Sequence, residues 1–338
     1  MNLNKKMLSR LMLVLMLALG LTSAACAAPS PPTWENPTTW DFTLHVSVTS
    51  DMVTKYGGLT GVRAKVDQQL VTVNQHYAGF DKPIRWIVKD LVVYSGSALT
   101  QAQLGTNGAN YSLTYTEQPV PENGGWRPWI YSIIINWLPT DGGVFGQYGA
   151  SSLIHELGHA RGGIDMYGLR VDGVNNPVNG AAYVPPASWM NLWYLPEQQL
   201  WDQYTRNIVN ASATTVYNDD RVVMNSLPAT YRVKVVNSSG NLVPNATVSV
   251  YPVDWFAYKV TPTAIMAGTS ATNGLWTLPS DPFGPSLSAP KWHLWRPLVL
   301  VTASVGTQKG YAWLSLPDAG NAYFANPTAP FQLTVVVG

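Results

Sequence analysis

The sequence is poor in charge, in cysteine and in long apolar segments. Only 12% of its 338 residues are charged and the formal net charge is +1, which is about half the usual charged fraction. We therefore expect no nucleic-acid partner and no electrostatic attraction to a membrane surface. The single cysteine, Cys26, excludes an internal disulfide and a cysteine-based latency switch.

Residues 1–27 are predicted to be a signal peptide. Two lysines precede an apolar run over residues 11–21, and small residues follow it. The run is too short to cross a membrane. Cleavage after Ala27 would give a secreted protein that begins with a linker over residues 28–39. The alternative is a bacterial lipoprotein anchored through Cys26, but serine stands where such signals usually carry leucine.

The strongest functional signal is His155-Glu-Leu-Gly-His159, which is followed by Gly162 and Asp165. Two of the five histidines stand four residues apart, so on a helix both rings lie on one face and can reach one metal ion. Glu156 lies beside that ion without binding it, which suits a general base acting on metal-bound water. Gly162 can end the helix in a left-handed conformation, and the returning chain can offer Asp165 as a third ligand.

Read as HExxHxxGxxD, these residues resemble the metzincin class of zinc endopeptidases, in the aspartate variant of its snapalysin-like members. That class carries a tight methionine turn after the metal helix, and Pro186-Ala-Ser-Trp-Met190-Asn-Leu-Trp-Tyr194 looks like such a turn. The resemblance covers residues 40 to 210.

The resemblance implies one catalytic Zn²⁺ held by His155, His159 and Asp165, with Met190 beneath the site. It also implies that the strand near Ile133 pairs with an extended substrate.

Other candidate residues leave alternatives open. Some metzincins use a tyrosine near the turn to stabilise the transition state; here Tyr194 is the candidate, although Leu192 stands at the usual position. Glu197 is the alternative third ligand, but it falls beyond the turn, so Asp165 is favoured. A calcium ion is an alternative for the oxygen-bearing residues between Asp172 and Asn179, where a plain loop is favoured. The three other histidines, at 45, 76 and 293, are expected to be structural.

Periodicity predicts the elements around the motif. Strands are expected over residues 40–49, 84–94 and 130–138, a helix over 62–77, and a long loop region over 95–129. Ser151 or Ser152 can cap the metal helix. A helix after Pro196 would carry Leu200, Trp201, Tyr204 and Ile208 on one face.

After residue 215 the pattern contains short strands alone, over residues 231–237, 246–253, 274–278, 298–305, 310–316 and 331–337. The absence of any helical pattern predicts an antiparallel β-sandwich over residues 216–338. Its turn patterns resemble transthyretin-like or carboxypeptidase-regulatory-like accessory domains. The predicted fold class is therefore α+β: a metzincin-like zincin domain over residues 40–215, with a mixed twisted sheet, an active-site helix and a methionine turn, followed by an all-β sandwich.

These features predict a secreted zinc-dependent endopeptidase that acts on a protein or peptide substrate, with Glu156 as general base. One alternative is a zinc amidase acting on cell-wall peptides, because the chemistry at an amide is shared. The other is a secreted binding protein with a non-catalytic metal site, against which the intact Glu156 argues.

Overall fold

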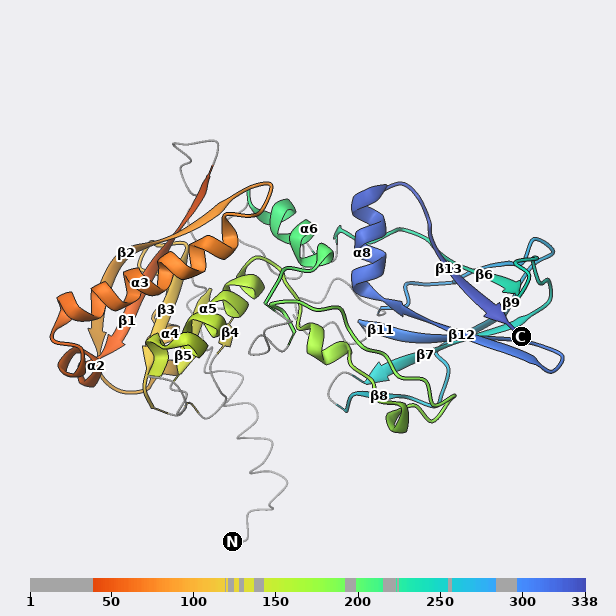
Figure 1. The fold of residues 1–338 in the computed structure, drawn as a ribbon, viewed down its shortest axis with the longest axis horizontal. Coiled ribbons are helices and arrows are strands. Elements are labelled where there is room, and N and C mark those ends of the chain that lie inside the picture. Colours follow the sequence, from red (N-terminus) through yellow and green to blue (C-terminus); the bar gives the residue numbers. More distant parts are fainter. Residues whose placement is uncertain are drawn as a thin grey trace, which may run out of the picture.

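The computed structural model describes residues 39–118, 120, 125–127, 131–136, 143–191, 199–214, 223, 225–254, 257–283 and 297–338. These residues form helices and several separate sheets, which is consistent with the predicted α+β fold class (Figure 1). In the described part of the chain, no helix has the length and apolar character needed to span a membrane.

The first sheet has the strand order β2-β1-β3-β5-β4. Its strands are β1 (Trp40–Thr49), β2 (Ile84–Tyr94), β3 (Tyr111–Thr116), β4 (Gly125–Arg127) and β5 (Ser132–Asn136). All neighbours pair in parallel except β4, which runs antiparallel to β5 and forms the edge. Because β5 is hydrogen-bonded on both sides, the expectation that the strand near Ile133 pairs with a substrate is wrong. The outer edge belongs to β4.

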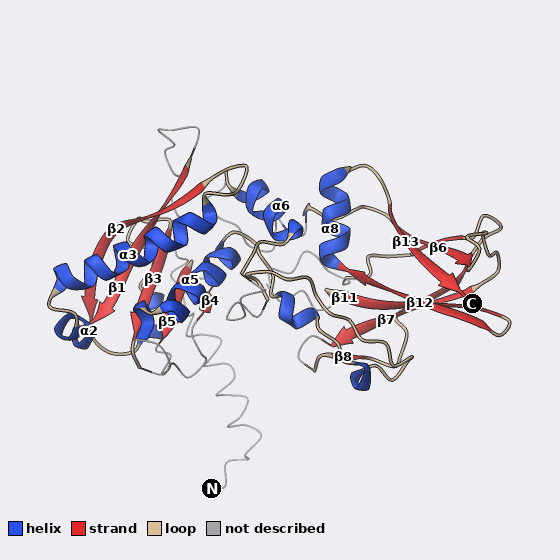
Figure 2. Cartoon of the chain, in the orientation of Figure 1, coloured by secondary structure: helices blue, strands red, loops and turns tan. Residues whose placement is uncertain are grey.

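One face of this sheet supports the helix that contains His155 and His159. Alternate β1 residues, among them Phe42 and Leu44, point into a core that is covered by α3 (Leu59–Tyr77) and α5 (Gln147–Ala160). Both helices lie across the same face of the sheet in Figure 2. Tyr77 of α3 donates a hydrogen bond from its hydroxyl to the Ile154 carbonyl of α5 at 2.8 Å. Because the sheet and α3 hold α5 from two sides, the helix has a fixed position.

The region expected to be a long loop, residues 95–129, contains α4 (Ala98–Gln103), β3 and β4. The prediction failed for β3 because it is buried on both faces while half of its side chains are polar. Ser112, Thr114 and Thr116 face one side, alternating with tyrosines and a leucine, so the segment lacks the apolar run typical of a buried strand.

Two helix starts also differ from the prediction. The α5 helix begins after Gly146, four residues before the serines proposed as its cap. Helix α6 (Gln203–Ser212) begins after Asp202, whose side chain accepts a hydrogen bond from the Thr205 backbone N–H at 2.9 Å. Leu200 and Trp201 therefore precede the helix, because a capping carboxylate fixes its start more strongly than apolar periodicity does.

The C-terminal part forms two sheets, ordered β10-β6-β13 and β12-β11-β7-β8, with β9 pairing with β7. The strands are β6 (Tyr231–Asn237), β7 (Thr247–Asp254), β8 (Lys259–Val260), β9 (Met266–Thr269), β10 (Leu275–Thr277), β11 (Leu298–Val305), β12 (Gln308–Ser315) and β13 (Phe331–Val337).

Two features correct the antiparallel, helix-free expectation for this part. Strands β6 and β13 pair in parallel, and helix α8 (Leu316–Ala325) lies between β12 and β13. The Ser315 side chain caps α8 and a proline occupies its first turn. Gly320 interrupts an already short apolar pattern, so sequence periodicity does not reveal this helix.

The second hydrophobic core crosses the domain boundary predicted near residue 215. It combines Met166, Met190 and Ile208 with Val233 and Leu300 of the C-terminal strands. Helices α6 and α8 pack against each other at this junction (Figure 1). The two parts of the chain therefore share one apolar core. The segments on either side of the candidate metal ligands pack against that core.

The α6–α8 contact gives a test of this shared core. A Cβ atom on Gly320 would lie 2.4 Å from Cε2 of the buried Tyr204. Gly320→Ala should therefore destabilise the protein by about 1–3 kcal/mol, the usual cost of overpacking. Gly79→Ala, where a Cβ would meet nothing within 4 Å, is the matched control. Unfolding in denaturant, followed both by tryptophan fluorescence and by loss of zinc binding, should show one transition. Two separate transitions would mean that the N-terminal and C-terminal parts unfold independently.

Candidate metal centre

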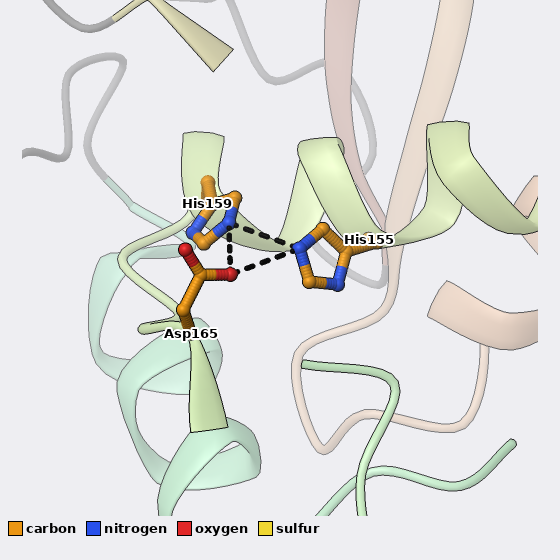
Figure 3. A group of neighbouring side chains, drawn as sticks. All are labelled: His155, His159 and Asp165. Atoms are coloured by element: carbon orange, nitrogen blue, oxygen red, sulfur yellow. Dashed lines mark hydrogen bonds and ion pairs between the residues drawn. The ribbon is translucent and has the colours of Figure 1, made fainter. Parts of the chain in front are cut away.

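Three side chains converge at the C-terminal half of α5. His155 and His159 project from adjacent turns of the helix, and Asp165 points toward both of them from the returning chain (Figure 3). The two Nε2 atoms are 3.1 Å apart, and Asp165 Oδ1 lies 3.1 Å from Nε2 of His155 and 3.0 Å from Nε2 of His159. The three residues proposed as metal ligands are therefore brought together.

The Nδ1 atom of each imidazole ring is hydrogen-bonded to a backbone carbonyl oxygen. Nδ1 of His155 lies 2.7 Å from the carbonyl oxygen of Trp189, and Nδ1 of His159 lies 2.8 Å from that of Gly163. A carbonyl oxygen only accepts, so each Nδ1 carries a proton, and each ring in its neutral form would present the Nε2 lone pair to the centre.

This donor set fits Zn²⁺. Two imidazole nitrogens and one carboxylate oxygen form a common three-ligand set for catalytic zinc, and tetrahedral ligands at 2.0–2.1 Å would stand roughly 3.3 Å apart. The observed spacings of 3.0–3.1 Å are close to that value. Three acceptor atoms so near one another repel unless a cation or a proton lies among them.

The pKa shifts of His159 and Asp165 also indicate that the site requires a positive charge. Burial lowers the pKa of His159, but the Asp165 carboxylate outweighs it and the pKa is raised to about 9. Burial also raises the pKa of Asp165, but the two imidazoles outweigh this effect and hold that pKa well below its usual range. The buried carboxylate therefore demands a positive charge beside it.

The turn predicted at the end of the metal helix has the expected form. Gly162 has φ +90°, a conformation that favours glycine, and the chain reverses there to present Asp165. The Met166 backbone N–H then donates to the Met190 carbonyl at 2.6 Å. This bond ties the third proposed ligand to the segment that supports His155.

Met190 lies in a tight turn, where the Asn191 backbone N–H donates to the Ser188 carbonyl at 2.9 Å. Its thioether packs against the metal helix: a Cβ atom on Gly158 would lie 2.5 Å from the sulfur, and one on Gly163 would lie 3.1 Å from it. Two glycines thus let the methionine approach the backbone on both sides of the helix end.

Glu156 lies against the edge strand β4. A Cβ atom on Gly125 would be 3.4 Å from Glu156 Oε2 and 3.6 Å from Oε1. Gly125 has φ +131°, again a conformation that disfavours a side chain. The glycine leaves space beside the carboxylate that a larger residue would fill.

Arg161, which the sequence did not single out, anchors the end of the metal helix. It is fully buried, and its guanidinium donates to the Tyr111 hydroxyl at 2.6 Å and to the Ser212 carbonyl. Its Cζ atom also lies 4.3 Å from the ring centroid of Phe42. Burial lowers its pKa. Arg161 links α5 to the first sheet and to α6.

Tyr167 was also missed, and its ring lies beside that of His155. Its ring stacks on that of His155, with centroids 6.3 Å apart and planes 19° from parallel. Burial and the Asp165 carboxylate raise its pKa. The available signal was its position two residues after Asp165, in the short 3-10 helix η3 (Met166–Leu169).

Other proposed residues lie elsewhere. Tyr194 and Glu197 fall outside the described residues. His45 is buried and pairs with Asp90 at 2.5 Å, as expected of a structural histidine. In the proposed calcium loop, which includes the 3-10 helix η4 (Gly173–Asn175), the Asn176 side chain bonds the loop's own atoms, including the Ala181 carbonyl. Among the described residues, one His/Cys/Asp/Glu group has metal-ligand spacing: His155, His159 and Asp165.

Comparisons with known proteins do not assign the chain to a family. No family model and no curated protein matches it. A solved structure described as "Structure of a chaperone-substrate complex" aligns with a TM-score of 0.36 and 10% identity, over 53% of this chain and 35% of that chain. A similarity that weak carries no argument about fold or function.

Zinc binding should release a proton. With a pKa of about 9, His159 is protonated in the metal-free protein at neutral pH, and zinc must displace that proton. Apparent zinc affinity should therefore rise about tenfold per pH unit between pH 7 and 9, then level off. Competition with a chelator of known affinity measures this; a flat profile over that range would contradict the assigned charge pair.

Substitution of Asp165 tests the ligand set. Asp165→Ala should weaken zinc binding by more than about 100-fold, beyond the usual effect of an outer-shell change. Asp172→Ala, an exposed aspartate nearby, should leave affinity unchanged. Glu197→Ala should also bind zinc normally. If Glu197→Ala loses zinc while Asp165→Ala binds it normally, Glu197 would be the third ligand instead of Asp165.

Proposed function

We propose that this chain is a zinc-dependent endopeptidase. The observation that carries the proposal is the convergence of His155 Nε2, His159 Nε2 and Asp165 Oδ1 within 3.1 Å of one another, with each Nδ1 held by a backbone carbonyl. Glu156, which is not a member of that group, supplies a carboxylate on the next residue of the same helix.

A Zn²⁺ ion held by these three residues would supply Lewis acidity, which lowers the pKa of water and polarises a carbonyl. Glu156 would accept the proton of the attacking water on its carboxylate and later deliver it to the departing amine. The Trp189 and Gly163 carbonyls keep both imidazoles in the required tautomer and orientation.

The neighbouring edge strand supports a peptide as substrate. β4 pairs with β5 on one side, and within the described sheet no strand covers its other side. An extended chain can add to such an edge through main-chain hydrogen bonds. Gly125 of this strand lies beside Glu156, so a peptide on the edge would pass the proposed general base.

The finer fold assignment belongs to the same proposal. The aspartate third ligand, the Met190 turn against Gly158 and the antiparallel edge strand support a metzincin-like arrangement. The two C-terminal sheets support a β-sandwich accessory region. We also propose secretion; the N-terminal signal on which it rests lies outside the described residues.

The general base is tested by Glu156→Gln. This variant should retain zinc but lose casein cleavage by about 10² to 10⁴-fold, because the amide cannot take a proton. Glu117→Gln is the matched control: Glu117 pairs with Lys55 at 2.7 Å and is not a member of the candidate ligand group, so this variant should cleave normally. Near wild-type activity in Glu156→Gln would remove Glu156 from the mechanism. Cleavage of cell-wall peptides but not casein by the wild type would favour an amidase.

A further inference from the structure

A groove of about 430 Å³ lies between α3 and α5, two helices that run side by side (Figure 1). Gln69 of α3 joins the two at one end, because its side-chain amide donates to the Val144 carbonyl at 2.8 Å. The α3 wall of the groove extends from Lys65 to His76, which is about 16 Å of helix. Among the described residues that line the groove, none is a proposed zinc ligand or the proposed general base. The groove is therefore separate from the candidate metal centre.

The walls of the groove carry several polar side chains with no partner inside the protein. Within the described part of the chain, four of these side chains form no hydrogen bond: Gln68 and Thr72 on α3, Gln147 on α5, and Gln199. A side-chain amide both donates and accepts hydrogen bonds, and so does a hydroxyl. The groove therefore offers donors and acceptors together along its length.

One of the lining hydroxyls is nearly buried. Ser151 of α5 lines the groove although it is only 5% exposed. A serine inside a helix often bonds the carbonyl four residues before it, but the Ser151 hydroxyl forms no hydrogen bond with any described residue. A buried hydroxyl without a partner is costly. A ligand in the groove that bonds this hydroxyl would remove that cost.

Aromatic rings stand at both ends of the groove, and its charge is low. Phe145 is half-buried just before α5, and at the other end the His76 ring packs edge-on against Trp189, with centroids 4.8 Å apart. Burial lowers the pKa of His76, so its ring is neutral at neutral pH. Lys65 is then the one charged side chain among the described lining residues. The groove is therefore suited to an uncharged ligand.

From these features we infer that the groove between α3 and α5 binds a neutral oligosaccharide. A sugar hydroxyl both donates and accepts, which matches the amide and hydroxyl side chains on the two walls. The C–H faces of sugar rings are apolar and pack on aromatic rings such as those at the two ends. The length of the groove suits a chain of linked rings. This site goes beyond the proposed endopeptidase function and does not depend on it.

Calorimetry on the purified full-length protein, with and without zinc, tests the inference. At least one of cellotetraose, chitotetraose and mannotetraose should bind with a Kd below about 1 mM. Ser151→Ala combined with Gln68→Ala removes one hydrogen-bonding group from each wall. This double variant should weaken binding by about 5- to 100-fold, because each neutral hydrogen bond is worth about 2- to 12-fold.

The matched control is Ser152→Ala combined with Gln75→Ala. These residues lie on the same two helices but do not line the groove, so affinity should stay within about twofold of wild type. If the first double variant does not fold, Gln68→Ala alone, at an exposed position, carries the same comparison against Gln75→Ala.

Three results would overturn the inference. The first is that none of the three neutral sugars binds. The second is that a sugar binds equally well to wild type and to the Ser151→Ala, Gln68→Ala variant, because it would then occupy another place. The third is that the acidic tetragalacturonate binds while the neutral sugars do not. Since binding is also measured without zinc, failure of the endopeptidase proposal would leave each of these readings unchanged.

Discussion

The convergence of three acceptor atoms in a nearly closed space is the constraint on which the metal region depends. His155 and His159 are almost fully buried, and the Asp165 side chain is 13% exposed. Two imidazole lone pairs and a carboxylate do not remain together in such a place without a positive charge. A proton meets this need in the metal-free protein, and the donor set and spacing match a zinc ion better.

Support for that convergence comes from both parts of the chain. The first sheet and α3 hold α5, while Gly162 turns the chain so that Asp165 faces the two histidines. Met190 lies against the end of the helix and belongs to the core formed with the C-terminal strands. The C-terminal region therefore helps to support the candidate metal site.

Sequence reasoning found what local periodicity and motif spacing encode. The strands over residues 40–49 and 84–94 and the helix ending at Tyr77 are confirmed, and the three proposed ligands converge. It missed elements whose stability comes from distant contacts. β3 has polar alternate residues that only the sheet buries, and α8 carries Gly320, which is explained by the ring of Tyr204. Arg161 was missed because its partners, Tyr111 and Ser212, are remote in the sequence. Tyr167 was missed because it lies two residues beyond the end of the recognised motif.

The central claim is that His155, His159 and Asp165 bind one zinc ion. Crystals of the purified protein, measured on both sides of the zinc absorption edge, test it most directly. The account predicts a single strong anomalous peak about 2.0–2.2 Å from the two Nε2 atoms and from an Asp165 carboxylate oxygen. A zinc peak bound by other residues, or no peak after the crystals are soaked in zinc, would contradict it.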